Sequence, residues 1–527
     1  MPVCRPLRNV CVAAALLGGT MAGVAGCPSS TPPGTPPGKT AAAPAGYGGA
    51  AKAPFDPVNE NGPIFEDWPK PAYSFVITGG QFGYLEPCGC AGLENQKGGL
   101  SRRHSLIKKL AADGWNPLPL DLGDQVRRAG PQSEIKFDKT LAALQTLGYG
   151  AVGLGVEDLR LMSGGALFSQ FSGVERPALF VSANVSMPGV ELPKFKIVEV
   201  AGRKIGVTSV LGKEYQTRVT IDDEKDLVFT DPAEALAAIL PELEAAKADH
   251  LVLLADAPPS ESKALATKFP QFDIVVTAEG AEEPPRAPQK LGERGALVEL
   301  GHKSMFAVVL GFYDDGKPPR YQRVPLDSRF PPSEEMTALL RDYLKQLETV
   351  GLAGLGVTPS VHPNASGPND PAGHFVGAKA CGECHKKAFR IWESRPKFSD
   401  HGRGHAAATD TLVKLDPPRQ FDPECLSCHS TGWNAKEFFP YATGFLSMNE
   451  TPLLAGNGCE NCHGPGGAHT AAERGSDRAL QDKLRQSVRR TKAEAEQNLC
   501  LKCHDHDNSP HFEFETYWPK VEHKGKD

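Results

Sequence analysis

Four copies of Cys-x-x-Cys-His constrain this chain more than any other feature. They read CGECH, CLSCH, CENCH and CLKCH and begin at residues 381, 425, 459 and 500 of 527. The two thiols of such a motif can form thioethers with the two vinyl groups of haem, and the adjacent histidine then lies under the iron. The motifs therefore predict four covalently bound haem c groups.

Each position in these motifs has an expected role. The predicted thioether cysteines are Cys381, Cys384, Cys425, Cys428, Cys459, Cys462, Cys500 and Cys503. The predicted proximal iron ligands are His385, His429, His463 and His504. Zinc and disulfides are rival uses of cysteine pairs, but a zinc site usually combines one CxxC with a second CxxC or with HxxxH. Here a histidine follows every pair directly, which favours haem.

Other histidines near the motifs could complete the coordination of the irons. His469 follows a Gly-Pro-Gly-Gly turn, His405 lies at the start of a helical pattern, and His523 lies near the end of the printed sequence. We favour these three as distal ligands, although each could instead be a surface histidine or a propionate partner. The competing candidates are His401, His506 and His511. A haem without a second imidazole keeps a position where a small molecule could bind.

The C-terminal segment resembles a known family of electron carriers. FVGAKACGECHKKAFRIWES, CLSCHSTGW, CENCHGPGGAH and FETYWPKVEH are similar to the cytochrome c-554 type of multihaem cytochrome over about residues 373–527. The resemblance implies closely packed haems, mainly bis-histidine ligation, and distal roles for His405, His469 and His523. Relatives often have a second histidine where this chain has Ala407. Few aliphatic residues occur here, so we expect a mainly helical and irregular domain wrapped around haem.

The N-terminus has the pattern of an export signal. Arg5 and Arg8 precede a short apolar run that is too short and glycine-rich for a comfortable membrane span. It ends in VAGC, which resembles a bacterial lipobox, so we expect a signal peptide over residues 1–26 and acylation of Cys27. An ordinary secretory signal is the alternative. Residues 27–72 are rich in Pro, Gly and Ala and predict an extended tether.

Residues 73–325 alternate apolar strand patterns with amphipathic helical patterns. YSFVITG, PLPLDLG, KIGVTSV, HLVLLAD and FDIVVTA are typical of buried strands, and helical segments separate them. This order predicts an α/β layered sandwich with mixed sheets. We expect a hairpin with Gly202 in its turn, and ALVEL and MFAVVLGFY closing the second sheet. A helix plus linker over residues 326–372 then leads to the haem domain at 373–527.

The α/β segment resembles the metallophosphoesterase domain of exported 5′-nucleotidases through ITGGQFGYLEP, GGLSRRHSLIKKL, LDLGD and FVSANV. That family binds two metals, but of its ligands this chain keeps only Asp124. The other ligand positions fall on Gly80, Phe82, Val156, Glu157, Asp256, Glu279 and Ala281. Because a two-metal hydrolase needs both ions, we expect a domain that has lost phosphoesterase activity. The alternative is an all-oxygen site for Mg²⁺, Ca²⁺ or Mn²⁺ made by Asp124, Glu157, Asp158, Asp256 and Glu279.

Cys88 and Cys90 follow the first strand of this domain in EPCGCAG. A Cys-Gly-Cys loop could form a reducible disulfide, bind a soft metal or act as a thiol centre. A structural disulfide or two inert thiols is the alternative. The combination of EPCGC with GGLSRR looks like a nucleotidase-like branch in which selenocysteine can occur. This resemblance favours Cys88 and Cys90 as a candidate redox pair.

Together these features predict an exported electron carrier whose partners are redox proteins and, through the lipid anchor, a bacterial membrane facing the periplasm. The net charge of -6 gives no reason to expect nucleic acid binding. The nucleotidase-like domain would serve as a docking or thiol-redox module. Two enzymatic alternatives remain: an oxidoreductase acting on a small nitrogen or sulfur compound at a five-coordinate haem, and a residual metal-dependent phosphoesterase.

Overall fold

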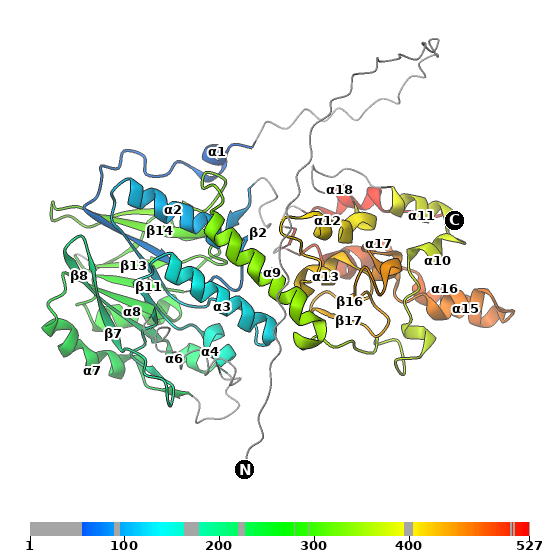
Figure 1. Cartoon of the computed structure of the whole chain (residues 1–527), viewed down its shortest axis with the longest axis horizontal. Helices are drawn as coiled ribbons and strands as arrows, with labels where there is room; N and C mark the ends of the chain where they lie inside the picture. Colours follow the sequence, from blue (N-terminus) through cyan, green and yellow to red (C-terminus); the bar gives the residue numbers. More distant parts are fainter. Residues whose placement is uncertain are drawn as a thin grey trace, which may run out of the picture. The chain divides into compact units, whose positions relative to one another are not determined.

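The structure of the chain is a computed structural model (Figure 1). It describes residues 55–88, 95–162, 179–219, 227–278, 280–293, 295–394, 404–505, 508–509 and 512–525. Within it, Phe55–Asp527 forms one compact unit. The predicted signal peptide, Cys27 and residues 28–54 of the predicted tether lie outside the described residues. No helix in the described ranges has the length and apolar character needed to cross a bilayer.

The first sheet of the α/β domain has five strands in the order β15-β14-β1-β4-β5. Its central strand β1 runs parallel to β4 and antiparallel to β14, so the sheet is mixed, as predicted. The strands are β1 (Tyr73–Thr78), β4 (Pro117–Asp121), β5 (Ala151–Val152), β14 (Phe306–Phe312) and β15 (Arg320–Pro325).

The second sheet has six strands in the order β12-β13-β11-β10-β8-β7. They are β7 (Phe195–Val200), β8 (Arg203–Leu211), β10 (His250–Asp256), β11 (Ile274–Thr277), β12 (Gln289–Leu291) and β13 (Gly295–Glu299). The four central strands are parallel, and β7 joins β8 through the predicted hairpin. Ala201 and Gly202 form its two-residue turn with φ of 49° and 76°, the left-handed backbone that such a turn requires.

The central strands are buried on both faces because their side chains alternate between two cores. In β10, Val252 and Leu254 belong to the core shared by the two sheets. Leu251 and Leu253 belong to a second core that also contains residues of α7 and α8. A period of two residues sends neighbouring side chains to opposite faces of a strand. An unbroken apolar run such as HLVLL therefore fits a sheet covered on both sides.

Helices complete the layers of the α/β domain (Figure 1). They are α1 (Pro57–Asn61), α2 (Leu100–Ala112), α3 (Pro131–Thr146), α4 (Val156–Met162), α6 (Lys213–Gln216), α7 (Pro232–Ala245), α8 (Pro259–Lys268) and α9 (Glu334–Gly354). The helix predicted beyond the α/β domain is α9, and it packs against α2 and α3. Two short ribbons, β2 (Pro87–Cys88) with β3 (Lys97–Gly98) and β6 (Val185–Ser186) with β9 (Val228–Phe229), lie outside the main sheets.

Two sequence-based expectations about this domain differ from the structure. MFAVVLGFY forms β14, which belongs to the first sheet and pairs with β1 instead of closing the second. Residues 55–72, expected in the tether, pack on the domain: the rings of Phe65 and Trp68 lie 4.8 and 5.8 Å from that of Trp115. The tether was predicted from the Pro, Gly and Ala content of the whole segment, which gave no weight to its aromatic side chains. The sheet of β14 was predicted wrongly because an apolar strand pattern does not indicate which sheet the strand joins.

The C-terminal domain consists of short helices and connecting turns, as predicted. The helices are α10 (Ala378–Gly382), α11 (Lys386–Glu393), α12 (Ala408–Lys414), α13 (Pro423–His429), α14 (Cys459–His463), α15 (Gly467–Glu473), α16 (Arg478–Val488), α17 (Lys492–Glu494) and α18 (Phe514–Tyr517). A two-stranded ribbon joins β16 (Trp433–Asn434) to β17 (Phe439–Pro440). Its main cluster of fully buried apolar residues comprises Phe375, Leu412, Leu426, Trp433, Phe445 and Leu454.

Leu254→Ala tests the sandwich arrangement. Leu254 is fully buried in the core shared by the two sheets, so its truncation should lower the free energy of unfolding by about 2–5 kcal/mol. Denaturant unfolding followed by far-UV circular dichroism measures this change. Val228→Ala is the control, because Val228 is 50% exposed and its truncation should have little effect. Equal losses in the two variants would contradict the proposed core.

Candidate functional site

Each Cys-x-x-Cys-His motif folds into about one helical turn. The second motif ends α13, the third forms α14, the first spans the end of α10, and the fourth begins with a 3-10 turn over Cys500–Lys502. In the first and fourth motifs the histidine amide donates to the carbonyl of the first cysteine at 2.9 Å. Positions i, i+3 and i+4 of a helical turn share one face. The two thiols and the imidazole of each motif can therefore serve one group.

Three predicted distal histidines lie opposite three motif histidines. The pairs, with the distances between ring centroids, are His385–His469 at 6.3 Å, His405–His504 at 6.1 Å and His463–His523 at 5.8 Å. An imidazole nitrogen binds a first-row transition metal at about 2 Å, so two imidazoles on opposite sides of one iron have centroids about 6 Å apart. The separations in all three pairs match the space that one iron needs.

The protonation of these imidazoles suits metal binding. Two of them hold Nδ1 against a main-chain carbonyl: His463 against Val488 at 2.8 Å and His523 against Val521 at 2.9 Å. His429 of the second motif does the same, with Nδ1 3.0 Å from the carbonyl oxygen of Ala408. Because a carbonyl only accepts, Nδ1 carries the proton and Nε2 keeps its lone pair. Burial, together with nearby His405, lowers the pKa of His504 to about 4. The neutral imidazole is the form that binds a metal.

The second motif differs from the other three. Within the part of the chain that the structure describes, no histidine ring faces His429 at a comparable distance. The competing candidates His401, His506 and His511 lie outside that part. The facing ring pairs of the described residues therefore include three of the four motif histidines.

Glu460, inside CENCH, links the third motif to His469. Its carboxylate is 3% exposed and accepts hydrogen bonds from the amides of Gly466 and Gly377, each at 2.7 Å. Gly466 belongs to the turn that leads into α15, which carries His469. Gly377 precedes the first motif, whose His385 faces His469. The buried carboxylate of Glu460 thus bonds to the segment before His385 and to the turn before His469.

In the α/β domain, the carboxylates at the strand ends bind main-chain amides. Oδ1 of Asp124 accepts from the amide of Glu157 at 2.9 Å, and Oδ2 of Asp256 accepts from that of Val156 at 3.1 Å. Asp158 accepts from the amide of Asp124 at 2.7 Å. The amides of Val156 and Glu157 open α4 and have no partner within the helix. These carboxylates therefore cap a helix and fix the loops around it.

Burial acts on the charge of these carboxylates in the opposite direction to the amide bonds, which lower the pKa. Burial, followed by the charges of Asp256 and Asp158, raises the pKa of Asp124 well above its usual value, and burial raises that of Asp158 to about 7. In the described ranges, no three His, Cys, Asp or Glu side chains are grouped to hold a metal ion. Glu279 of the predicted all-oxygen site lies outside those ranges.

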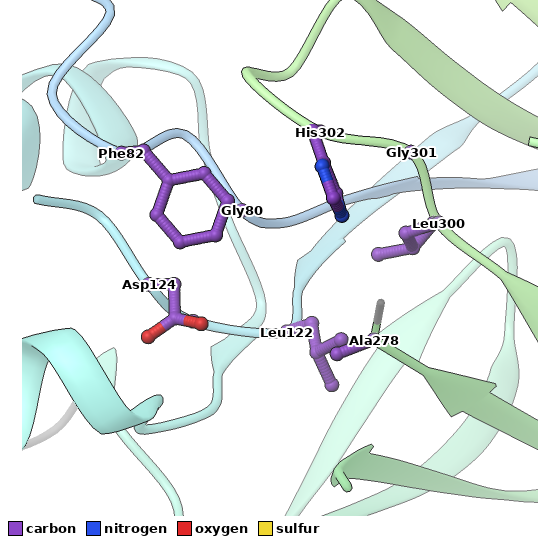
Figure 2. Close-up of a pocket in the computed structure, with 9 residues that line it drawn as sticks. Gly80, Phe82, Leu122, Asp124, Ala278, Leu300, Gly301 and His302 are labelled. Carbon is purple, nitrogen blue, oxygen red and sulfur yellow. The ribbon is translucent and has the colours of Figure 1, made fainter. Parts of the chain in front are cut away.

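A small hollow beside Asp124 occupies the place where the nucleotidase resemblance expects metals (Figure 2). Gly80 and Phe82, which stand at the positions of the family's Asp and His ligands, line this hollow. His302 lines it from a different side. The His302 ring meets the Phe82 ring edge-on, with centroids 6.0 Å apart, and its Nε2 is buried without a hydrogen-bond partner among the described residues. Sequence reasoning missed His302, whose one signal was a Gly-His pair after the strand ALVEL.

The predicted redox pair begins at β2. The main chain of Cys88 pairs with Lys97 of β3, while Cys90 and the side chain of Cys88 lie outside the described residues. Glu86, two residues before Cys88, accepts from Nε and Nη2 of Arg419 at 2.9 and 2.5 Å. Arg419 belongs to the C-terminal domain and is 8% exposed. This ion pair fixes the approach to the Cys-Gly-Cys loop against the haem-motif domain.

Comparisons with known proteins support this division of the chain. Residues 380–464 match the family described as cytochrome c554 and c-prime. Cytochrome c-554 of Nitrosomonas europaea is 29% identical over 155 residues, which cover 26% of this chain and 60% of the relative. The snake venom 5′-nucleotidase of Gloydius brevicauda is 29% identical over 187 residues, which cover 34% of this chain and 31% of the relative.

A solved structure gives a further similarity. The 5′-nucleotidase precursor of Thermus thermophilus is 20% identical and superimposes with a TM-score of 0.45, covering 53% of this chain and 59% of that one. The chain spans less than two thirds of each of these relatives. What the matches identify is the architecture: the chain joins a 5′-nucleotidase-like α/β domain to a C-terminal domain of the cytochrome c554 type.

Proposed function

We propose that this protein is an exported electron carrier that holds four haem c groups in its C-terminal domain. The observation that carries the proposal is the set of three facing histidine pairs, each separated by the space that one iron requires. Haem iron supplies reversible one-electron chemistry when it is bound. The eight motif cysteines would attach the haems, and His385, His429, His463 and His504 would be the proximal ligands.

The distal ligands would come from other parts of the chain. His469, His405 and His523 would complete the haems of the first, fourth and third motifs, respectively. Each haem would then join two segments distant in sequence, so attachment and folding of this domain would be coupled. Paired neutral imidazoles favour electron transfer because they leave the iron no open position.

The α/β domain would serve as a docking or thiol-redox module without hydrolytic activity. The amide bonds made by Asp124, Asp158 and Asp256 support this role, because they use carboxylates that a metal site would need. The Glu86–Arg419 pair supports a link between the Cys88/Cys90 loop and the haem domain. Electron exchange between that loop and the haems is part of the proposal.

Export and membrane attachment are also proposed. Thioether attachment of haem takes place outside the cytoplasm, and the N-terminal segment ending at Cys27 has the pattern of a lipoprotein signal. The tether would then hold the folded unit away from the membrane surface on the periplasmic side. Its partners would be redox proteins that donate and accept electrons.

A second candidate function rests on His429. The three facing pairs of the described residues do not include His429. If none of His401, His506 and His511 supplied a second imidazole, the haem of the second motif would be five-coordinate and could bind a small nitrogen or sulfur compound. In that case the protein would be an oxidoreductase as well as a carrier.

The haem count tests the first proposal. Full-length protein produced with cytochrome c maturation machinery should gain the mass of four haems, since all four motifs can present two thiols and a histidine. Intact-protein mass spectrometry measures the gain. Cys459→Ala/Cys462→Ala should lose one haem, and the control Cys88→Ser/Cys90→Ser should keep four. An unsubstituted protein with three haems or fewer would refute the count.

His469→Ala tests the distal assignment. Loss of its imidazole should convert the haem of the first motif from low spin to high spin and allow that one haem to bind CO. EPR of the oxidised protein and CO difference spectra of the reduced protein report the change. His362→Gln is the matched control, because the His362 ring lies against Phe375 and Tyr441 and faces no motif histidine in the described structure. Unaltered spectra of His469→Ala would rule out this ligand.

A phosphatase assay tests the proposed loss of hydrolysis. With Mn²⁺ or Zn²⁺ added, the protein should hydrolyse nucleoside monophosphates no faster than the buffer does, because Asp124 and its neighbours bind amides instead of metals. Asp124→Asn should leave this background unchanged. Metal-dependent hydrolysis that disappears in Asp124→Asn would restore the phosphoesterase alternative.

A further inference from the structure

The two domains meet at the helix that carries the second haem motif. Tyr343 and Leu347 of α9 form an apolar cluster that also receives Phe421 of the C-terminal domain. Gln132 of α3 donates to Oδ1 of Asp422 at 2.9 Å. Asp422 is the N-cap of α13, since its side chain accepts from an amide of the first turn. The α/β domain thus contacts the start of a helix that ends in Cys428 and His429.

A partly buried ion pair lies at the centre of this contact. Lys136 of α3 is 8% exposed, and its Nζ lies 2.6 Å from Oε2 of Glu424 in the first turn of α13. Arg128 approaches the other carboxylate oxygen at 3.3 Å and stacks its guanidinium 3.9 Å above the ring of Phe438. Both cations come from the α/β domain, whereas the acidic partner directly precedes Cys425.

The contacts keep both partners charged. Burial alone would lower the pKa of Lys136, but Glu424 and Asp422 raise it. Burial alone would raise the pKa of Glu424, but Lys136 and Arg128 lower it. Glu424 directly precedes Cys425, so the ion pair with Lys136 lies beside a thioether position of the second motif.

We propose that Lys136 is a positioning and charge-compensating residue for the second haem: its ammonium group offsets the charge of Glu424 and thereby sets the reduction potential of the haem attached at Cys425 and Cys428. The inference rests on the proposed attachment of haem at this motif. Oxidised haem carries one more positive charge than reduced haem. Removing the Lys136 ammonium group would leave only Arg128 beside Glu424 and would therefore favour oxidation. Loss of a buried counter-ion is felt over several ångströms because protein screens charge weakly.

Opposite substitutions separate this effect from simple disruption. Lys136→Met should shift the redox equilibrium of one haem about tenfold toward the oxidised form, which lowers its midpoint potential by about 59 mV. Glu424→Gln should shift the same haem toward the reduced form, because Lys136 then lacks a counter-ion. Lys136→Arg should keep the original potential. Reductive titration of the full-length four-haem protein, followed optically and by EPR, resolves the components.

Lys139→Met is the matched control. Lys139 is also 8% exposed and lies on α3. Its Nζ pairs with Asp342 of α9 at 2.7 Å, so this ion pair involves no residue of the C-terminal domain. This variant should leave all potentials unchanged. Shifts of the same sign in Lys136→Met and Glu424→Gln, or no shift in either, would overturn the inference. A missing second haem in the unsubstituted protein, detected by mass, would instead refute the proposed attachment.

Discussion

The spacing of facing imidazoles is the constraint on which the haem-motif domain depends. Each of the three pairs joins a motif histidine to one from a different part of the chain, at 5.8–6.3 Å between centroids. Main-chain carbonyls hold Nδ1 of His463 and His523, and the buried carboxylate of Glu460 bonds to the amides of Gly377 and Gly466 in the segments that lead to His385 and His469. Since short helices and turns supply only a small apolar core, this polar framework determines how the segments are arranged around the motifs.

The α/β domain retains a layered architecture while its strand-end carboxylates serve a different purpose. Asp124, Asp158 and Asp256 satisfy amides of α4 and its neighbouring loops. A buried carboxylate without a partner is costly, and these amide bonds supply partners for the three side chains. The same domain supplies Lys136, Arg128 and Glu86 to the C-terminal domain. Three of its described ion pairs with the C-terminal domain therefore involve Glu424 of the second-motif helix and nearby Arg419.

Much of the local structure could be predicted from the sequence. HLVLLAD became a doubly buried strand and Gly202 a hairpin turn because alternation and backbone preference are local properties. The sheet assignment of MFAVVLGFY was wrong, since an apolar strand satisfies either sheet. His302 was missed because it lines the hollow from a segment that is not among the metal-ligand motifs of the nucleotidase resemblance. Side chains that converge from distant segments carry no shared local signal.

The sequence by itself determined the chemistry available to this protein: four Cys-x-x-Cys-His motifs, further histidines, and an α/β segment without the imidazoles of a two-metal site. Those properties follow from residue type and short spacing. The tertiary structure alone decided which histidine faces which motif, which amides occupy the carboxylates, and that Lys136 meets Glu424 across 288 residues of chain. Such pairings depend on the packing of whole helices. Residue types and short spacings in one sequence do not show which distant residues come into contact.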